Sequence, residues 1–158
     1  MQNEGFSILE VLVVICICTI LAAIGIQHWK SLQLRNELIT TTQQLAYFLN
    51  EVQVKAYTQN DTYNLYLFLS PWCLTVTQAE RPINCNQGIL QFNKPNNSVV
   101  ISGLTDKKTI SFWGRRNMAQ TTSFQLQNDI GISKVFISFR GRIRSCSQNN
   151  YLAGLPPC

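Results

Sequence analysis

Three arginines alternate near the C-terminal end of the chain, at Arg140, Arg142 and Arg144, with Gly141 between the first two. On an extended strand, alternate side chains project from one face about 6.6 Å apart, with Ile143 on the other face. Guanidiniums at this spacing can bind successive phosphates of a nucleic acid. Alternatively, the arginines keep a solvated edge strand soluble or pair with acids of neighbouring molecules.

The positive charge of the chain is concentrated in the same region. The 158 residues carry 13 Lys and Arg against 8 Asp and Glu, a formal net charge of +5. Residues 1–106 hold five basic and seven acidic residues, whereas residues 107–158 hold eight and one, so the two parts carry −2 and +7. Lys134, Arg115 and Arg116 are therefore candidate outer contacts for a polyanion bound along the arginines.

Four of the six cysteines form two sets, Cys73 with Cys85 and Cys146 with Cys158, each twelve positions apart. A metal site favours shorter spacings between its cysteines. Four cysteines allow three disulfide pairings, of which we favour Cys73–Cys85 with Cys146–Cys158. Each bond would contribute about 3 kcal/mol in the chain-entropy model, and such bonds persist in a periplasm or cell exterior but not in the cytosol. The tail 151–157 is then expected to be tied back by Cys158.

Groups for acid–base or metal catalysis are scarce. His28 is the only histidine, there are eight acids, and no glycine-rich phosphate loop is present. A histidine at the edge of an apolar segment is expected to be an interfacial polar residue and offers no basis for a catalytic triad or a metal site. The chain is therefore expected not to be an enzyme.

An apolar N-terminal segment is the first element that must position these groups. Residues 6–26 contain one charged residue, Glu10, and 21 helical residues span about 31 Å, close to the ~30 Å hydrocarbon core of a bilayer. A cleaved secretory signal would need a positive leader, but Met1–Gly5 has no Lys or Arg. We therefore expect a transmembrane helix in the mature protein, with Cys16 and Cys18 as ordinary apolar residues within it.

Helical periodicity continues beyond the apolar segment. Apolar residues recur at spacings of three, four and seven, which predicts one apolar stripe on a helix. The stripe consists of Leu34, Leu38, Leu45, Phe48, Leu49, Val52 and Ala56. The sequence therefore predicts a single helix from Phe6 to Thr58, whose second half packs on a domain.

Short β-type runs separated by Gly, Pro and Asn clusters follow the helix. They are Tyr63–Leu69, Trp72–Thr77, Ile89–Phe92, Val99–Ile101, Thr109–Trp113, Ser123–Leu126, Lys134–Phe139 and Arg142–Arg144. These runs predict an antiparallel sheet laid on the helix stripe, in an α+β head of about 100 residues that can hold a modest core. Phe112, Trp113 and Phe124 are expected in that core rather than on a base-stacking surface.

The string Gly5-Phe6-Ser7-Ile8-Leu9-Glu10, followed by the apolar run, resembles the processing site of type IV prepilins and type II secretion pseudopilins. The resemblance implies that a prepilin peptidase cleaves after Gly5 and methylates the new N-terminal residue, Phe6. It also implies that Glu10 pairs with the terminal amine of a neighbouring subunit as helices pack into a filament. That pairing would offset the cost of a buried carboxylate, roughly 2.5–3.5 kcal/mol at a helix centre.

Two further strings are similar to the GspH/FimT-type minor pilins: Phe112-Trp113-Gly114-Arg115-Arg116-Asn117 and Gly141-Arg142-Ile143-Arg144-Ser145-Cys146. A third string, Trp72-Cys73-Leu74, is similar to one member of that group, the prepilin-peptidase-dependent protein A. The group includes minor pilins of type IV pili, pseudopilin H of type II secretion and the prepilin-peptidase-dependent protein A. In its competence-associated members a matching Gly-Arg-x-Arg motif is implicated in binding DNA for uptake, which points here to Gly141, Arg142 and Arg144, with Arg140 beside them.

The resemblance implies a pilin fold and a minor pilin that primes, or is incorporated into, a type IV pilus, with the pseudopilin H of a type II secretion system as the alternative. Its expected partners are other minor and major pilins or pseudopilins, the prepilin peptidase, an inner-membrane assembly platform and, in natural transformation, DNA. No cofactor is expected, because a cytoplasmic ATPase drives assembly.

Four segments make up the expected layout. Residues 1–5 are the cleaved leader, residues 6–28 the transmembrane and filament-core helix, residues 29–58 its amphipathic continuation, and residues 59–158 a β-rich periplasmic head. The basic residues that flank the helix on its far side favour the opposite orientation, but the disulfides place the head outside. The protein is thus expected in the inner membrane as a single-pass subunit, and then in a pilus or pseudopilus filament.

Overall fold

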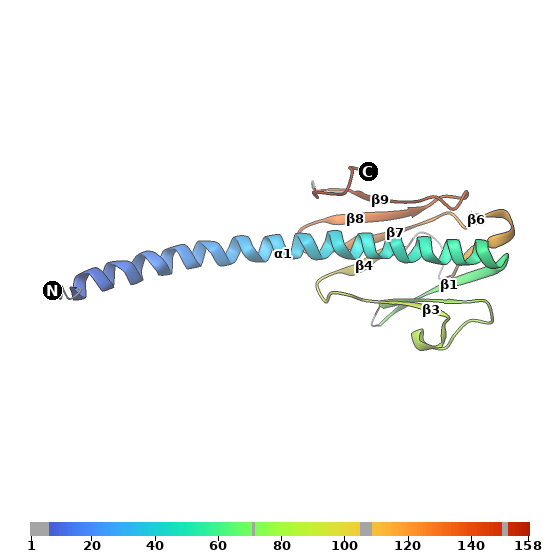
Figure 1. The fold of residues 1–158 in the computed structure, drawn as a ribbon, viewed down its shortest axis with the longest axis horizontal. Coiled ribbons are helices and arrows are strands. Elements are labelled where there is room, and N and C mark those ends of the chain that lie inside the picture. Colours follow the sequence, from blue (N-terminus) through green and yellow to red (C-terminus); the bar gives the residue numbers. More distant parts are fainter. Residues whose placement is uncertain (1–6, 71, 105–108, 150–151) are drawn as a thin grey trace, which may run out of the picture. The chain divides into compact units, whose positions relative to one another are not determined.

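The computed structural model describes residues 7–70, 72–104, 109–149 and 152–158. A long helix, α1 (Ile8–Gln59), is followed by strands and two short 3-10 helices (Figure 1). The strands are β1 (Thr62–Leu69), β2 (Trp72–Thr77), β3 (Leu90–Asn93), β4 (Val100–Leu104), β5 (Thr109–Trp113), β6 (Met118–Ala119), β7 (Thr122–Gln127), β8 (Ile132–Ile137) and β9 (Ile143–Ser147). The 3-10 helices are η1 (Cys85–Gln87) and η2 (Gly114–Arg116). The chain divides into two compact units between Gln33 and Leu34.

The first unit contains the apolar part of α1. The helix is long and apolar enough to cross a membrane, and none of its most apolar stretch is buried. Glu10 is an acid in its first turn, where the carbonyl of Ser7 accepts from the amides of Glu10 and Val11 at 3.0 and 3.2 Å. The predicted helix is therefore confirmed from Ile8, and the expected start at Phe6 lies outside the described residues.

In the second unit, the amphipathic part of α1 carries the apolar stripe into a core. Leu38, Leu45, Leu49 and Val52 have no exposed surface. The other predicted stripe residues are also buried, except for Leu34, which is half-buried. The stripe prediction is confirmed, because residues three and four apart lie on one side of a helix and meet the sheets together.

Two antiparallel sheets cover this part of α1 rather than the single sheet expected from the sequence. The strand order is β3-β2-β1-β5-β6 in the first sheet and β4-β7-β8-β9 in the second. In Figure 1, β8 and β9 lie at the top of the head and β1 and β3 at the bottom. The α+β class is confirmed, with the buried faces of both sheets and the helix stripe forming one core cluster. The alternating pattern predicted strands but not which strands pair.

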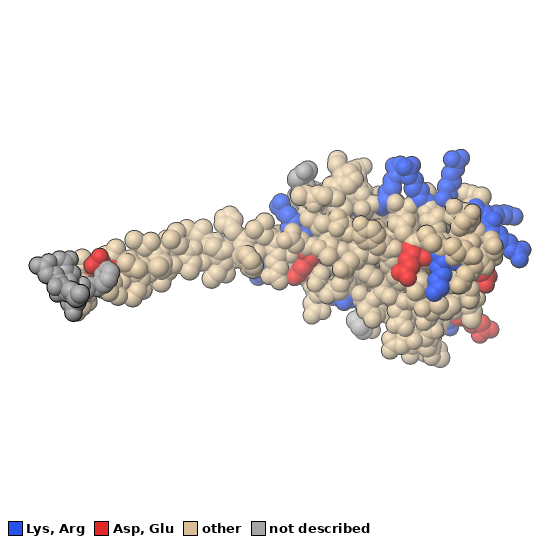
Figure 2. Space-filling model, viewed as in Figure 1, with Lys and Arg blue, Asp and Glu red and all other residues tan. Residues whose placement is uncertain are grey.

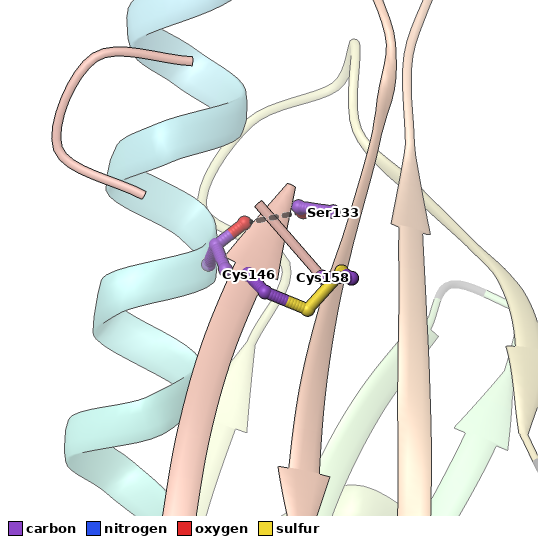
Figure 3. The surroundings of a disulfide bond; sticks show 4 residues. Ser133, Cys146 and Cys158 are labelled. Atoms are coloured by element: carbon purple, nitrogen blue, oxygen red, sulfur yellow. Dashed lines mark hydrogen bonds between the residues drawn. A yellow bond between two sulfur atoms is a disulfide. The ribbon is translucent and has the colours of Figure 1, made fainter. Parts of the chain in front are cut away.

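Both favoured disulfides are present. Cys73–Cys85 joins β2 to η1, and Cys146–Cys158 joins β9 to the C-terminal residue. Figure 3 shows the second bond beside Ser133, whose hydroxyl is hydrogen-bonded within the buried interface between β8 and α1. The partner is Thr42 of α1, with 2.6 Å between the two side-chain oxygens. The Thr42 hydroxyl also donates to the carbonyl of Leu38 at 2.6 Å, so the contact with Thr42 provides a partner for the buried Ser133 hydroxyl.

The C-terminal segment closes against the edge of β9. The amide of Ser147 donates to the carbonyl of Pro156 at 2.8 Å, and the amide of Cys158 donates to the carbonyl of Ser147 at 2.9 Å. Leu152 and Leu155 are 0% and 3% exposed and belong to the core cluster. The tied-back tail is therefore confirmed over residues 152–158, while Tyr151 lies outside the described residues. We call residues 152–158 the C-terminal clip.

Helix α1 ends in a compact turn, and the connection between β5 and β6 is hydrogen-bonded to this turn. Asn60 has a left-handed φ of 52°, its amide donates to Tyr57, and the amide of Asp61 donates to Ala56. These bonds are the Schellman pattern that satisfies carbonyls at a helix C-terminus. The amide of Gly114 then donates to the carbonyl of Asp61 at 3.0 Å. The start of η2 is thus fastened to the end of the helix.

Replacing Gly114 by alanine is expected to destabilise the head by about 3 kcal/mol, because a well-packed site is overfilled. A Cβ atom there would lie 2.0 Å from the carbonyl oxygen of Ala56 and 2.6 Å from that of Asp61, and backbone atoms cannot move aside cheaply. Urea unfolding of Gly114→Ala and of Gly103→Ala as control measures the difference. In the control, the nearest atom would be 3.6 Å away, so a similar loss in both variants would contradict the prediction.

Candidate nucleic-acid interface

The residues expected to act in processing and assembly lie at the N-terminal end. Gly5 and Phe6, the proposed cleavage and methylation positions, lie outside the described residues. Glu10 lies in the first turn of α1, with its side chain exposed. The structure therefore describes the place of Glu10 on the helix but not the geometry of the cleavage site.

The arginines near the C-terminus do not form the expected ladder on an extended strand. Strand β8 ends at Ile137 and β9 begins at Ile143, so Arg140 lies in the hairpin loop and Arg142 just before β9. Only Arg144 lies on a strand. The strand expected at Lys134–Phe139 thus ends later than β8 does. The strand expected at Arg142–Arg144 begins earlier than β9 does.

Gly141 is the reason for this departure. Its φ is +70°, and its amide donates to the carbonyl of Ser138 at 2.9 Å, while the amide of Ser138 donates to the carbonyl of Arg142 at 3.0 Å. This is a three-residue hairpin loop in which a turn is followed by a left-handed residue, the position that favours glycine. The glycine interrupts the strand alternation on which the ladder depended.

The surroundings of position 141 leave little room for a side chain unless Gln53 moves aside. A Cβ atom there would lie 2.0 Å from Nε2 of Gln53 on α1 and 3.3 Å from the carbonyl oxygen of Asn117. The same Nε2 donates to Oδ1 of Asn117 at 3.0 Å. The amide of Ala119 in β6 donates to the carbonyl of Phe139 at 3.0 Å. The hairpin tip is thus held by the helix and by β6.

The three arginines nevertheless converge on one surface hollow of about 720 Å³. Arg140, Arg142 and Arg144 line it from the loop and β9, and Phe136 lines it from β8. The remaining lining residues are Thr121, Thr122, Ser123, Ile137 and Ser138. All three arginines are exposed, and none of the described residues that line the hollow carries a carboxylate. We call it the arginine hollow.

The electrostatics of this surface favour an anion. Among residues 7–70, 72–104, 109–149 and 152–158, no ion pair neutralises the guanidiniums of the arginine hollow. Figure 2 shows basic side chains gathered at the end of the head where β6 and the β8–β9 turn lie. Arginine presents a planar fork of donors that matches phosphate oxygens. The hollow therefore has the chemistry of a phosphate-binding surface.

A second hollow, of about 450 Å³, reaches the hairpin tip at Phe139. Arg115 and Arg116 of η2 line it together with Trp113 and Phe139. Trp113 is 37% exposed and Phe139 55% exposed. The expectation that Trp113 is a core residue is therefore wrong, whereas Phe112 and Phe124 are fully buried as expected.

This second hollow also contains an acid, unlike the arginine hollow. Asp61 lines it, and its carboxylate accepts from the amide of Thr62 at 2.7 Å and from Nε2 of Gln78 at 3.1 Å. Burial raises the pKa of Tyr63 above its ordinary value, and the negative charge of Asp61 raises it further by a smaller amount. A negative charge beside Arg115 and Arg116 makes this hollow a weaker anion site than the first.

Lys134, also expected as an outer contact, lies on β8 two residues before Phe136 and is half-buried. It does not line either hollow. In the part of the chain that the structure describes, no group of three or more His, Cys, Asp or Glu residues could hold a metal ion.

No protein-family model and no curated protein matches the chain. Two solved structures share its fold. The type IV minor pilin FimU of Pseudomonas aeruginosa aligns with a TM-score of 0.58 at 14% identity, over 70% of this chain and 88% of that one. The minor pseudopilin EpsH from the type 2 secretion system of Vibrio cholerae aligns with a TM-score of 0.56 at 9% identity, over 72% of this chain and 99% of that one.

Proposed function

We propose that this chain, which has the pilin fold, is a minor pilin of the GspH/FimT type, held in the inner membrane by α1 before assembly, with its head in the periplasm. The observation that carries this proposal is the combination of a pilin-fold head with an apolar, unburied helix segment on the same α1. Two disulfides in the head fit an oxidising compartment.

Assembly would begin with removal of residues 1–5 by the prepilin peptidase and methylation of Phe6. In the assembled filament, α1 segments would pack together and Glu10 would neutralise the terminal amine of a neighbouring subunit. The exposure of Glu10 on the helix is consistent with that role, because a carboxylate at membrane depth needs a partner. Other minor and major pilins and the inner-membrane platform are the proposed partners.

Gly5→Ala is expected to leave an uncleaved precursor, because Gly5 is the residue of the prepilin-like string after which cleavage is proposed. The variant should run on gels as an uncleaved precursor, while the wild type produces a product lacking residues 1–5. Mass spectrometry of the N-terminal peptide of the wild type should give Phe6 with one added methyl group. Wild-type and variant proteins of equal mass after expression with an active prepilin peptidase would overturn the pilin assignment.

A second proposed role is DNA binding for uptake through the arginine hollow. The observation that favours it is the convergence of Arg140, Arg142 and Arg144 on one hollow, whose described lining residues include no Asp or Glu. The alternative for the same arginines is that they keep this edge soluble or pair with acids of neighbouring subunits. This role is tested by titrating the protein with DNA, using the arginine variants described in the Discussion.

The alternative is pseudopilin H of a type II secretion system. The fold is shared by a minor pilin and a minor pseudopilin at nearly equal TM-scores. Deleting the gene in its own bacterium separates the two roles: loss of surface pili with normal export of secreted proteins supports the minor pilin. Normal pili with loss of exported proteins would replace it by the pseudopilin.

A further inference from the structure

The arginine hollow contains an exposed aromatic side chain on the outer face of the second sheet. In the register of this sheet, Phe136 of β8 lies opposite Ser123 of β7 and opposite Arg144 of β9. Its neighbours along β8, Val135 and Ile137, face the core and are 0% and 1% exposed. Phe136 is 39% exposed. The sheet therefore turns one aromatic side chain outward, next to a guanidinium.

Cations surround this aromatic side chain on two sides. Arg144 is its cross-strand partner, and Arg140 and Arg142 line the same hollow from the hairpin loop. Lys134 lies two positions earlier on β8, on the same face and about 6.6 Å along the strand. The hydroxyl residues Thr121 and Ser123 line the hollow from the β7 side.

Exposed aromatic rings among cations suit one class of nucleic acid. In a duplex the bases are stacked inside, so an aromatic ring on the protein surface gains little from the phosphates that face it. In a single strand the bases are free, and each one that stacks on an aromatic side chain contributes about 1–3 kcal/mol. A volume of about 720 Å³ lies within the range of ordinary ligand pockets, about 300–1,000 Å³.

We infer that the outer face of the second sheet binds single-stranded DNA, with an unpaired base stacked on Phe136 and the phosphates held by Arg142 and Arg144. This inference rests on the proposed DNA-binding role and names the form of DNA that the site takes. In this proposal the bound DNA strand continues across the tip of the β8–β9 hairpin, where Phe139 and Trp113 offer further exposed rings beside Arg115 and Arg116.

The test uses the full-length protein in a non-ionic detergent with its disulfides intact. Three fluorescent probes of equal length are titrated at several salt concentrations: a mixed-sequence single strand, the same sequence as a duplex, and a strand of abasic sites. The variants are Phe136→Leu, Phe136→Tyr, Arg144→Gln and, as a control for the loss of an aromatic residue, Tyr47→Leu. Tyr47 is 75% exposed on α1 and lines neither hollow.

We expect the wild type to bind the single strand more tightly than the duplex or the abasic strand. Phe136→Leu should weaken single-strand binding about tenfold, which corresponds to about 1.4 kcal/mol of lost stacking. It should leave the salt dependence and the binding of the other two probes unchanged, because no phosphate contact is lost. Phe136→Tyr should restore the affinity, Tyr47→Leu should have no effect, and Arg144→Gln should weaken binding of all three probes.

Two results would overturn the inference while leaving the DNA-binding role intact. They are duplex binding as tight as single-strand binding, and an unchanged single-strand affinity in Phe136→Leu. Absence of binding to every probe at low salt would instead overturn the DNA-binding role, and the inference with it. Circular dichroism of Phe136→Leu checks that the head remains folded, and Phe136→Tyr provides a second variant with a ring of similar size.

Discussion

Replacing Arg142 and Arg144 together by glutamine is expected to weaken DNA binding about 100-fold. Both guanidiniums line the arginine hollow and are exposed. A charge-assisted hydrogen bond to phosphate contributes about 1.5 kcal/mol at the lower end of its range, so two such contacts give about two powers of ten. Each lost phosphate contact also means that fewer counterions are released on binding. The negative slope of log affinity against log salt should therefore become less steep, by about 1.8 for a duplex.

Net charge alone must be separated from the local effect of these arginines. The double variant Arg81→Gln/Lys94→Gln removes the same total charge at positions that line neither the arginine hollow nor the second hollow. It should reduce affinity only slightly, through the long-range potential of the head. Equal losses in the two double variants, measured by fluorescence anisotropy, would show that the arginine hollow is not the binding site.

Replacing Cys146 and Cys158 together by serine is expected to destabilise the head by at least about 3 kcal/mol, the cost of opening a loop of this length in the chain-entropy model. The variant Cys73→Ser/Cys85→Ser opens a loop with the same sequence separation of 12. We expect the C-terminal pair to cost more, because this bond also holds the C-terminal clip in place. Leu152 and Leu155 of the clip fill the core.

Urea unfolding monitored by tryptophan fluorescence measures these differences, because Trp72, one of the three tryptophans, is 4% exposed in the folded head. Leu155→Ala provides a diagnostic for the clip, because loss of a buried leucine side chain costs about 2–5 kcal/mol. In the Cys146→Ser/Cys158→Ser background the same substitution should cost much less, since the clip has already left the core. Fully additive losses would show that the clip stays docked without its disulfide.

The helix, the disulfides and most strand positions were predictable from local pattern. The spacing of the apolar residues along α1 predicted the buried stripe, because an amphipathic helix buries its apolar face against the core. The division into two sheets was not predictable, because it depends on pairings between distant residues, such as Leu65 with Ile110 and Ile101 with Leu126. The short strand β6 (Met118–Ala119) has too few residues to show any alternation.

The candidate site was predictable in its composition but not in its geometry. The three arginines were found by their spacing, but the assumption of an extended strand was wrong because Gly141 ends the alternation. A glycine between two basic residues after a β-type run is itself a signal of a short hairpin loop. Phe136 was missed because a single aromatic residue in a strand gives no sign of which face it lies on until the register is known.

The backbone requirement for glycine at position 141 bears on how sequence motifs of this kind carry information. The left-handed backbone would select glycine here even in a protein that had lost every nucleic-acid ligand. In a library randomised at positions 140–144, glycine should therefore be recovered by selection for folding alone. Enrichment of arginine at positions 142 and 144 should require selection for binding. In a Gly-Arg-x-Arg search, the glycine thus reports the hairpin, and only the arginines carry information about a ligand.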